Sequence, residues 1–131
     1  MKFLKIKETC LYVQNLERAR SFYEQTLELP LISYVENKHV FFQAGESVLL
    51  LFNPDDSKNK ISPPAHYGNG KQHFAFEVSS TAYDEAKQWI RSKGIVITDE
   101  VTWQSGVKSF YFEDTEGNVL EIVPDGGVWP N

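Results

Sequence analysis

Three side chains of this sequence have the chemistry of metal ligands and lie in segments that alternate like β-strands. His73 opens the stretch KQHFAFEV (71–78), where small or polar residues alternate with Phe and Val. Glu121 interrupts the apolar run VLEIV (119–123), and burying a carboxylate is costly unless it is paired or bound to a cation. Glu8 shares one face of a third such segment with a cysteine and a tyrosine. Each also has a plain structural interpretation, for example a hydrogen-bonded strand-end histidine or an exposed charge.

The elements that position these residues follow the same order twice. In the first half, a strand in IKETCLYV (6–13) precedes a helix in NLERARSFYEQTLEL (15–29), with Asn15 as its N-cap and Pro30 as its end. Three strands follow: LISYV (31–35), HVFFQA (39–44) and SVLLLF (47–52).

The second half repeats this order. The strand HFAFEV (73–78) precedes a helix in SSTAYDEAKQWIRSKG (79–94), capped near Ser79 or Ser80, with Gly94 at its left-handed end. Three strands are again predicted: IVITDEV (95–101), KSFYF (108–112) and VLEIV (119–123). A strand, helix and three strands in each half indicate a duplicated module.

The segment NPDDSKNKISPPAHYGNG (53–70) is too rich in Pro, Gly, Asn and charge to belong to either module. We interpret it as a linker that could also act as a lid. Each half is too small to bury a sizeable core alone. The prediction is therefore one domain, residues 1–131, with module 1 at about 5–53 and module 2 at about 71–124.

Superposing the two halves places the candidate ligands at equivalent positions. Matching the first strands puts Glu8 on His73, and matching the last strands puts Leu50 on Glu121. Three of these four positions hold a residue that can bind a metal. Two carboxylates and one imidazole suit a divalent first-row metal, with positions left open for water and substrate.

Composition excludes several classes of function. The 131 residues carry a net charge of −5 without a basic patch, which argues against nucleic-acid and membrane-surface binding. No stretch approaches the length of about 20 apolar residues that a membrane span needs. A single cysteine, Cys10, cannot form a disulfide within the chain, so a soluble protein of the cytoplasm is expected.

Three stretches in this order resemble the vicinal oxygen chelate superfamily, which includes glyoxalase I, extradiol dioxygenases and bleomycin-resistance proteins. They are ETCLYVQNLERARSFYEQTLELPL, KQHFAFEV and SFYFEDTEGNVLEIV, and the resemblance runs from Lys5 to about Pro124. It implies an α+β fold of two βαβββ modules, whose eight strands form an open, cup-like mixed sheet with helices outside.

The resemblance also implies a metal site. In metal-binding members, the ligands come from the first and last strands of the modules and point into the cup, which here selects Glu8, His73 and Glu121. The position of Glu8 is usually a histidine, and its replacement argues against extradiol ring cleavage, because two carboxylates and one histidine are not the two-histidine, one-carboxylate set of non-haem iron oxygenases. The expected function is that of a glyoxalase-like, metal-dependent lyase, isomerase or transferase. A divalent Zn, Ni, Mn or Fe would chelate neighbouring oxygens of a small substrate, and Glu8 or Glu121 would act as general base.

The alternative is a metal-free protein that binds a small molecule, as bleomycin-resistance members do. Aromatic and apolar residues on the predicted strands are candidates for the pocket wall in either case. We predict substrate contacts from Cys10, Tyr12, Phe52, Trp103 and Phe110. His66 and His39 are interpreted as surface residues of the linker and a hairpin. A homodimer is also expected, because open sheet edges are usually covered or paired and many members of the family are dimers.

Overall fold

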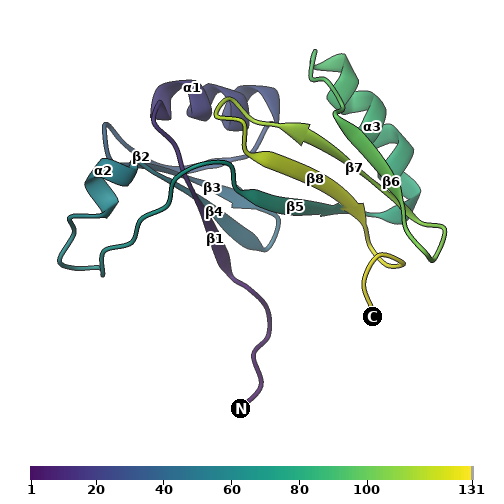
Figure 1. Ribbon diagram of the computed structural model, residues 1–131, viewed down its shortest axis with the longest axis horizontal. Coiled ribbons are helices and arrows are strands. Elements are labelled where there is room, and N and C mark those ends of the chain that lie inside the picture. The colour runs from purple at the N-terminus through teal and green to yellow at the C-terminus, as the bar shows by residue number, and fades with distance from the viewer. Residues whose placement is uncertain (131) are drawn as a thin grey trace. The chain divides into compact units, whose positions relative to one another are not determined.

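The computed structural model describes residues 1–130, which form two compact units (Figure 1). Unit 1 spans Met1–Gly70 and unit 2 begins at Lys71. Each unit contains a four-stranded mixed sheet, and each follows the predicted order of strand, helix and three strands. The α+β fold of two βαβββ modules is therefore confirmed, and the change of unit coincides with the predicted end of the linker.

The sheet of unit 1 has the strand order β1-β4-β3-β2. Its first strand runs parallel to β4, and the other two pairs are antiparallel. The elements are β1 (Glu8–Tyr12), α1 (Leu16–Arg20), η1 (Ser21–Thr26), β2 (Leu31–Val35), β3 (His39–Ala44), β4 (Ser47–Phe52) and α2 (Pro54–Ser57).

Unit 2 repeats this topology with the order β5-β8-β7-β6. Here β5 runs parallel to β8, and β8–β7 and β7–β6 are antiparallel. The elements are β5 (His73–Val78), η2 (Ser80–Ala82), α3 (Tyr83–Ser92), β6 (Asp99–Thr102), β7 (Lys108–Glu113) and β8 (Val119–Pro124).

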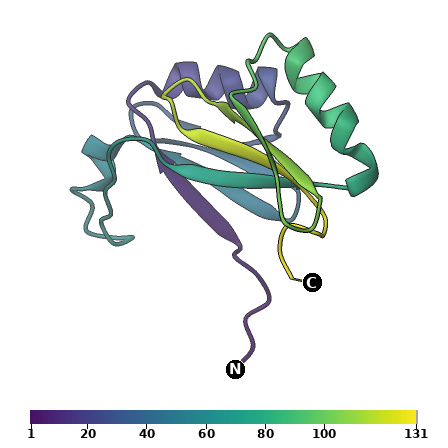
Figure 2. The same ribbon diagram turned by 45° about the vertical axis from the view of Figure 1, so that its right-hand side comes forward.

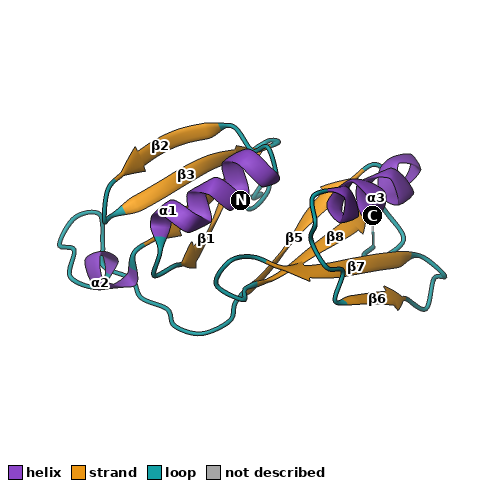
Figure 3. Cartoon of the chain, turned by 90° about the horizontal axis from the view of Figure 1, so that it is seen from above, coloured by secondary structure: helices purple, strands orange, loops and turns teal. Residues whose placement is uncertain are grey.

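One face of each sheet packs against the helix of its own unit (Figure 3). In unit 1, buried residues of β1 and β4 alternate with residues that are more exposed, so one face of these strands forms core and the other stays accessible. The core residues are Leu11, Val13, Leu16, Ala19, Tyr23, Leu27, Val40, Phe42, Leu49, Leu51 and Phe52. In unit 2 they are Ile90, Phe110, Phe112, Leu120 and Ile122.

The first helix begins where predicted but changes its winding. The Asn15 side chain accepts a hydrogen bond from the Arg18 N–H at 3.0 Å, which confirms it as the N-cap. After one turn of α-helix the chain continues as a π-helix and ends at Thr26. Glu28 adopts a φ of 60°, so the helix stops before Pro30 is reached.

The second helix departs from the predicted cap. Ser79 and Ser80 open a 3₁₀ turn, and neither side chain caps α3, whose preceding residue is Ala82. The Ser80 N–H is instead bound by the Asp125 carboxylate at 2.7 Å. Gly94, with a φ of 77°, confirms the predicted left-handed end.

The predicted linker carries local structure of its own and runs from β4 to β5 (Figure 2). Pro54 starts the one-turn helix α2, and the Asn53 side chain caps it by accepting a hydrogen bond from the Asp55 N–H at 3.0 Å. The first residues of the predicted linker therefore form a short helix.

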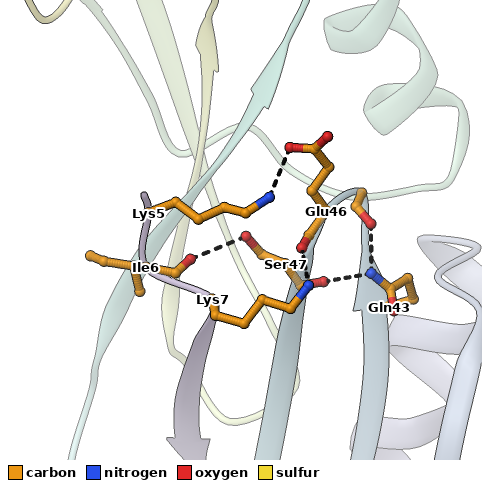
Figure 4. A network of polar contacts seen from close by, with 7 residues as sticks. Lys5, Ile6, Lys7, Gln43, Glu46 and Ser47 are labelled. Carbon is orange, nitrogen blue, oxygen red and sulfur yellow. Dashed lines mark hydrogen bonds and ion pairs between the residues drawn. The ribbon is translucent and has the colours of Figure 1, made fainter. Parts of the chain in front are cut away.

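The segment before β1 is attached to the turn between β3 and β4 (Figure 4). Lys5 forms an ion pair with Glu46 at 2.8 Å, and the Lys7 ammonium donates to the Glu46 carbonyl. The Ser47 hydroxyl donates to the Ile6 carbonyl at 3.3 Å. These contacts hold the chain that leads into Glu8.

Among residues 1–130, no helix has both the length and the apolar character that crossing a membrane requires.

Candidate functional site

The two parallel strand pairs have the same register, which confirms the equivalence predicted from the sequence. Glu8 lies opposite Val48 in unit 1, and His73 lies opposite Val119 in unit 2. Two residues further along, Leu50 of unit 1 and Glu121 of unit 2 occupy matching positions. The duplicated module therefore offers a ligand position on its first strand and another on its last.

In unit 2, both of these positions hold a metal-ligating side chain, and the two meet. His73 Nε2 lies 3.2 Å from Glu121 Oε1. The Glu121 side chain is only 8% exposed, whereas the His73 side chain is 50% exposed. The pair therefore presents an accessible imidazole in front of a buried carboxylate.

The other ring nitrogen of His73 fixes the chemistry of this contact. Nδ1 lies 2.8 Å from the Val119 carbonyl oxygen, which can only accept a hydrogen bond, so Nδ1 carries a proton. In the neutral ring, the Nε2 lone pair then faces a carboxylate oxygen. These two electron-rich atoms repel each other unless a proton or a cation lies against both. Metal-binding histidines are commonly oriented by such a bond from the far nitrogen to a backbone carbonyl.

Tyr111 contributes a further polar group beside Glu121. It lies opposite Glu121 on the neighbouring strand, and its ring centroid is 6.1 Å from that of His73. Burial raises the pKa of the Tyr111 hydroxyl, and a hydrogen bond to Glu121 raises it further, whereas Ser109 lowers it. The hydroxyl therefore stays protonated and can donate to the buried carboxylate.

Trp103 lies in the same unit, where its indole N–H donates to the Ser109 hydroxyl at 2.9 Å. Ser109 and Tyr111 share one face of β7, because residues two apart on a strand point the same way. Trp103 is thus attached to the strand face that carries Tyr111.

Phe110 points the other way and is fully buried. Its ring packs against Tyr83 at 5.6 Å and Phe112 at 6.3 Å, in the core between the sheet and α3. The interpretation of Phe110 as a substrate contact is therefore wrong for this structure. Three aromatic residues follow one another in SFYF, so the sequence does not show which of them faces the core. In the structure, Tyr111 is the aromatic residue of this run that lies on the accessible face.

In unit 1, Glu8, Cys10 and Tyr12 share the accessible face of β1. The Glu8 carboxylate is exposed and has no ion-pair partner among the described residues. The Cys10 thiol lies 3.9 Å from the Tyr12 hydroxyl. Within neither unit do three His, Cys, Asp or Glu side chains of the described residues gather into a metal-binding group. The participation of Glu8 alongside His73 and Glu121 thus stays a prediction.

Two histidines interpreted as surface residues have specific contacts in unit 1. Tyr12 and His66 are joined by a hydrogen bond of 2.7 Å between the hydroxyl and Nδ1. His39 stacks on Phe41 with ring centroids 3.9 Å apart, so it is half-buried rather than exposed. Both rings pack around Phe52, which is itself 7% exposed.

Both the sequence and the fold are similar to those of known proteins. A family model described as Glyoxalase/Bleomycin resistance protein/Dioxygenase superfamily matches residues 5–122. The chain belongs to this superfamily. A crystal structure of lactoylglutathione lyase from Agrobacterium tumefaciens is 31% identical, with a TM-score of 0.90 and 97% of each chain covered.

Two other solved structures are similar to this chain in fold. A virulence protein from Salmonella typhimurium is 24% identical, with a TM-score of 0.73, covering 96% of this chain and 100% of that one. An integron cassette protein from the Halifax Harbour sewage outfall is 22% identical, with a TM-score of 0.76, covering 94% of this chain and 100% of that one. The likeness to these two proteins concerns the fold alone.

Proposed function

We propose that this member of the glyoxalase superfamily is a metal-dependent lyase, isomerase or transferase acting on a small molecule with two neighbouring oxygens. The observation that carries the proposal is the His73–Glu121 pair. The protonated Nδ1 of His73 donates to the Val119 carbonyl, and Nε2 of the same ring is directed at the buried Glu121 carboxylate. This donor set suits a divalent cation of the Zn, Ni, Mn or Fe type.

Each residue has a distinct role in the proposed reaction. His73 and Glu121 would hold the cation, with Glu8 as the third ligand. When bound, the cation would act as a Lewis acid on the paired substrate oxygens. Glu8 or Glu121 would take a proton from the substrate as general base, and the Tyr111 hydroxyl would orient Glu121. The relative that is named a lactoylglutathione lyase supports this class of reaction.

The first prediction concerns metal binding by the purified chain. After dialysis against a chelator, calorimetric titration with Zn²⁺, Ni²⁺ or Mn²⁺ should show uptake of about one ion per chain. Glu121→Gln should weaken this binding by more than about 100-fold, because removing a ligand costs more than removing one of its supporting hydrogen bonds. The fold should remain intact, as judged by circular dichroism and urea unfolding.

Glu77→Gln is the matched control, since Glu77 is an exposed carboxylate on the same face of β5 as His73. It should bind the metal like the wild type. An activity assay with lactoylglutathione would extend the result to catalysis. Turnover should be lost when the metal is removed by a chelator and should return when the metal is added back. Equal metal affinity in the Glu121→Gln and wild-type proteins would contradict the proposed ligand set.

A metal-free binding protein is the second candidate, and one contact favours it. If His73 is protonated, Nε2 donates to Glu121 and the pair is satisfied without a cation. Failure of the wild-type protein to take up any of the three ions would then support this function. The partners proposed in either case are a small molecule and a second copy of the chain.

A further inference from the structure

The segment between the two predicted modules is attached to unit 1 at His66. The His66 N–H donates to the Ser57 carbonyl at 3.2 Å, and the Ser57 hydroxyl donates to the His66 carbonyl at 2.8 Å. Ser57 is completely buried, whereas His66 is exposed, so the double contact joins a surface residue to a buried one. The backbone of His66 is therefore fixed, although the residue lies in a connecting segment.

The side chain of His66 is fixed as well. Its ring packs edge-on against Phe52, with centroids 4.5 Å apart, and Nδ1 lies 2.7 Å from the Tyr12 hydroxyl. Burial raises the pKa of Tyr12 to about 12, so this hydroxyl keeps its proton at neutral pH. The hydroxyl oxygen accepts from the Cys10 thiol, and the hydroxyl can donate its proton to His66 Nδ1 when the ring is in the tautomer with the proton on Nε2. Nε2 then carries the ring's own proton and has no hydrogen-bond partner among the described residues.

A further aromatic ring and an ammonium group lie next to the two rings that contact His66, Tyr12 and Phe52, and a second ammonium group lies next to that further ring. Tyr67 is 57% exposed, and its ring centroid lies 6.4 Å from that of Tyr12. Lys58 lies 5.9 Å from the Tyr67 ring and Lys60 lies 5.8 Å from the Phe52 ring. Lys58 lies 3.5 Å from the Asp55 carboxylate, and Lys60 lies 3.7 Å from the Asp56 carboxylate. Both distances are longer than those of a tight ion pair, so both ammonium groups can turn to another anion.

We propose that Tyr12, Phe52, His66 and Tyr67 form a binding site for a flat aromatic carboxylate. The ligand ring would stack on the exposed tyrosine faces, as aromatic pairs do at centroid separations of about 4.5–7 Å. Its carboxylate would accept the Nε2 proton of His66 and lie within the field of Lys58 and Lys60. This inference rests on the second candidate function, metal-free binding of a small molecule, and deepens it by naming the class of ligand and by adding His66 and Tyr67 to the predicted contacts Tyr12 and Phe52.

The test uses 2-naphthoate as the probe and the metal-stripped full chain. A ¹H–¹⁵N NMR titration should shift the backbone amides of Tyr12, Phe52, His66 and Tyr67. Naphthalene-2-methanol keeps the flat ring without the charge, and decahydro-2-naphthoate keeps the charge without the flat ring. Both should bind at least about tenfold more weakly, because each lacks one of the two recognised features.

Two variants connect the binding to the named side chains. His66→Phe keeps a ring against Phe52 but removes the donor, and it should raise the Kd for 2-naphthoate about tenfold. Tyr67→Leu should weaken binding as well. Tyr34→Leu is its control, since Tyr34 also contacts a cation, Arg20 at 4.7 Å, outside the proposed site. Wild-type affinity in His66→Phe, or equal affinity for the three probes, would overturn the assignment.

The 2-naphthoate titration and the metal titration test the two sites independently. If 2-naphthoate shifts the unit 1 amides while the chain binds no metal, the aromatic site stands and the proposed function fails. If the metal binds but 2-naphthoate leaves those amides unmoved, the proposed function stands and the aromatic site fails.

Discussion

At the residue scale, the chemistry of His73 depends on its backbone acceptor more than on its position in the sequence. Alternation along two strands was sufficient to select His73 and Glu121, because a carboxylate within an apolar strand requires a partner. Their contact at 3.2 Å agrees with that selection. The bond to the Val119 carbonyl, which fixes the ring, follows only from the strand register. His66 was underestimated because its partner Tyr12 lies 54 residues away.

His39 provides a prediction about pH. Burial lowers the pKa of His39, and Lys60 and Lys38 lower it further, while Asp56 acts in the opposite direction. The unfolded chain therefore takes up a proton near pH 6.5, while the folded protein resists it. The free energy of unfolding should fall as the pH decreases from about 7 to 5, since the unfolded state binds more protons.

His39→Phe is the variant that isolates this effect, because Phe can stack on Phe41 but does not titrate. Urea unfolding at several pH values should show a smaller decrease for the variant than for the wild type. Parallel curves would mean that His39 does not contribute to the pH dependence.

At the element scale, strand positions were predicted well and element ends less well. Seven of the strands follow from alternation, but the segment IVITDEV begins pairing only at Asp99. Ile95 and Ile97 alternate like strand residues, yet the paired register with β7 starts only where Asp99 lies opposite Tyr111. Helix ends were set by contacts that alternation does not encode, such as the hydrogen bond between Ser80 and Asp125.

The turn between β7 and β8 is the element that aligns the His73–Glu121 pair. Asn118 is 1% exposed, and its side chain donates to the Asp114 carboxylate and accepts from the Gln72 N–H, each at 2.9 Å. It thereby ties the residue before His73 to the start of β8. Asn118→Ala should lower the free energy of unfolding by about 2–3 kcal/mol, because buried polar groups lose their partners.

Urea unfolding measures this change, and Asn59→Ala serves as the control. The Asn59 side chain donates to the Asp55 carbonyl at 3.0 Å, but this bond is exposed. Its loss should cost less than about 0.5 kcal/mol. Equal losses in the two variants would show that the turn has no special part in stability.

At the scale of the whole molecule, the duplicated plan predicted from the sequence is present in the structure, and the homodimer stays a prediction. The order of elements occurs twice because each half repeats the same hydrophobic pattern, and this was visible without coordinates. Assembly depends on surfaces instead. The edge strand β2 exposes Leu31, Ile32 and Val35 at 37%, 51% and 40%, and exposed apolar edges are usually covered by a partner.

We therefore expect the protein to be a homodimer. Light scattering at micromolar concentration should give about twice the chain mass of 15.0 kDa. Ile32→Lys places a charge on the exposed edge and should shift the mass toward that of a single chain. A wild-type mass of one chain would refute the dimer.

The parallel pairing of β5 with β8 also has a consequence for the order of folding. It joins His73 to Val119 across 46 positions of the chain, whereas β6, β7 and β8 pair as neighbouring hairpins. Contacts between near neighbours form before distant ones, since closing a long loop costs more entropy. The hairpins can thus be complete while His73 is still separate from Glu121. We therefore expect the imidazole and the carboxylate to come together late in folding, so that a chain with an assembled candidate site has already folded the unit that holds it.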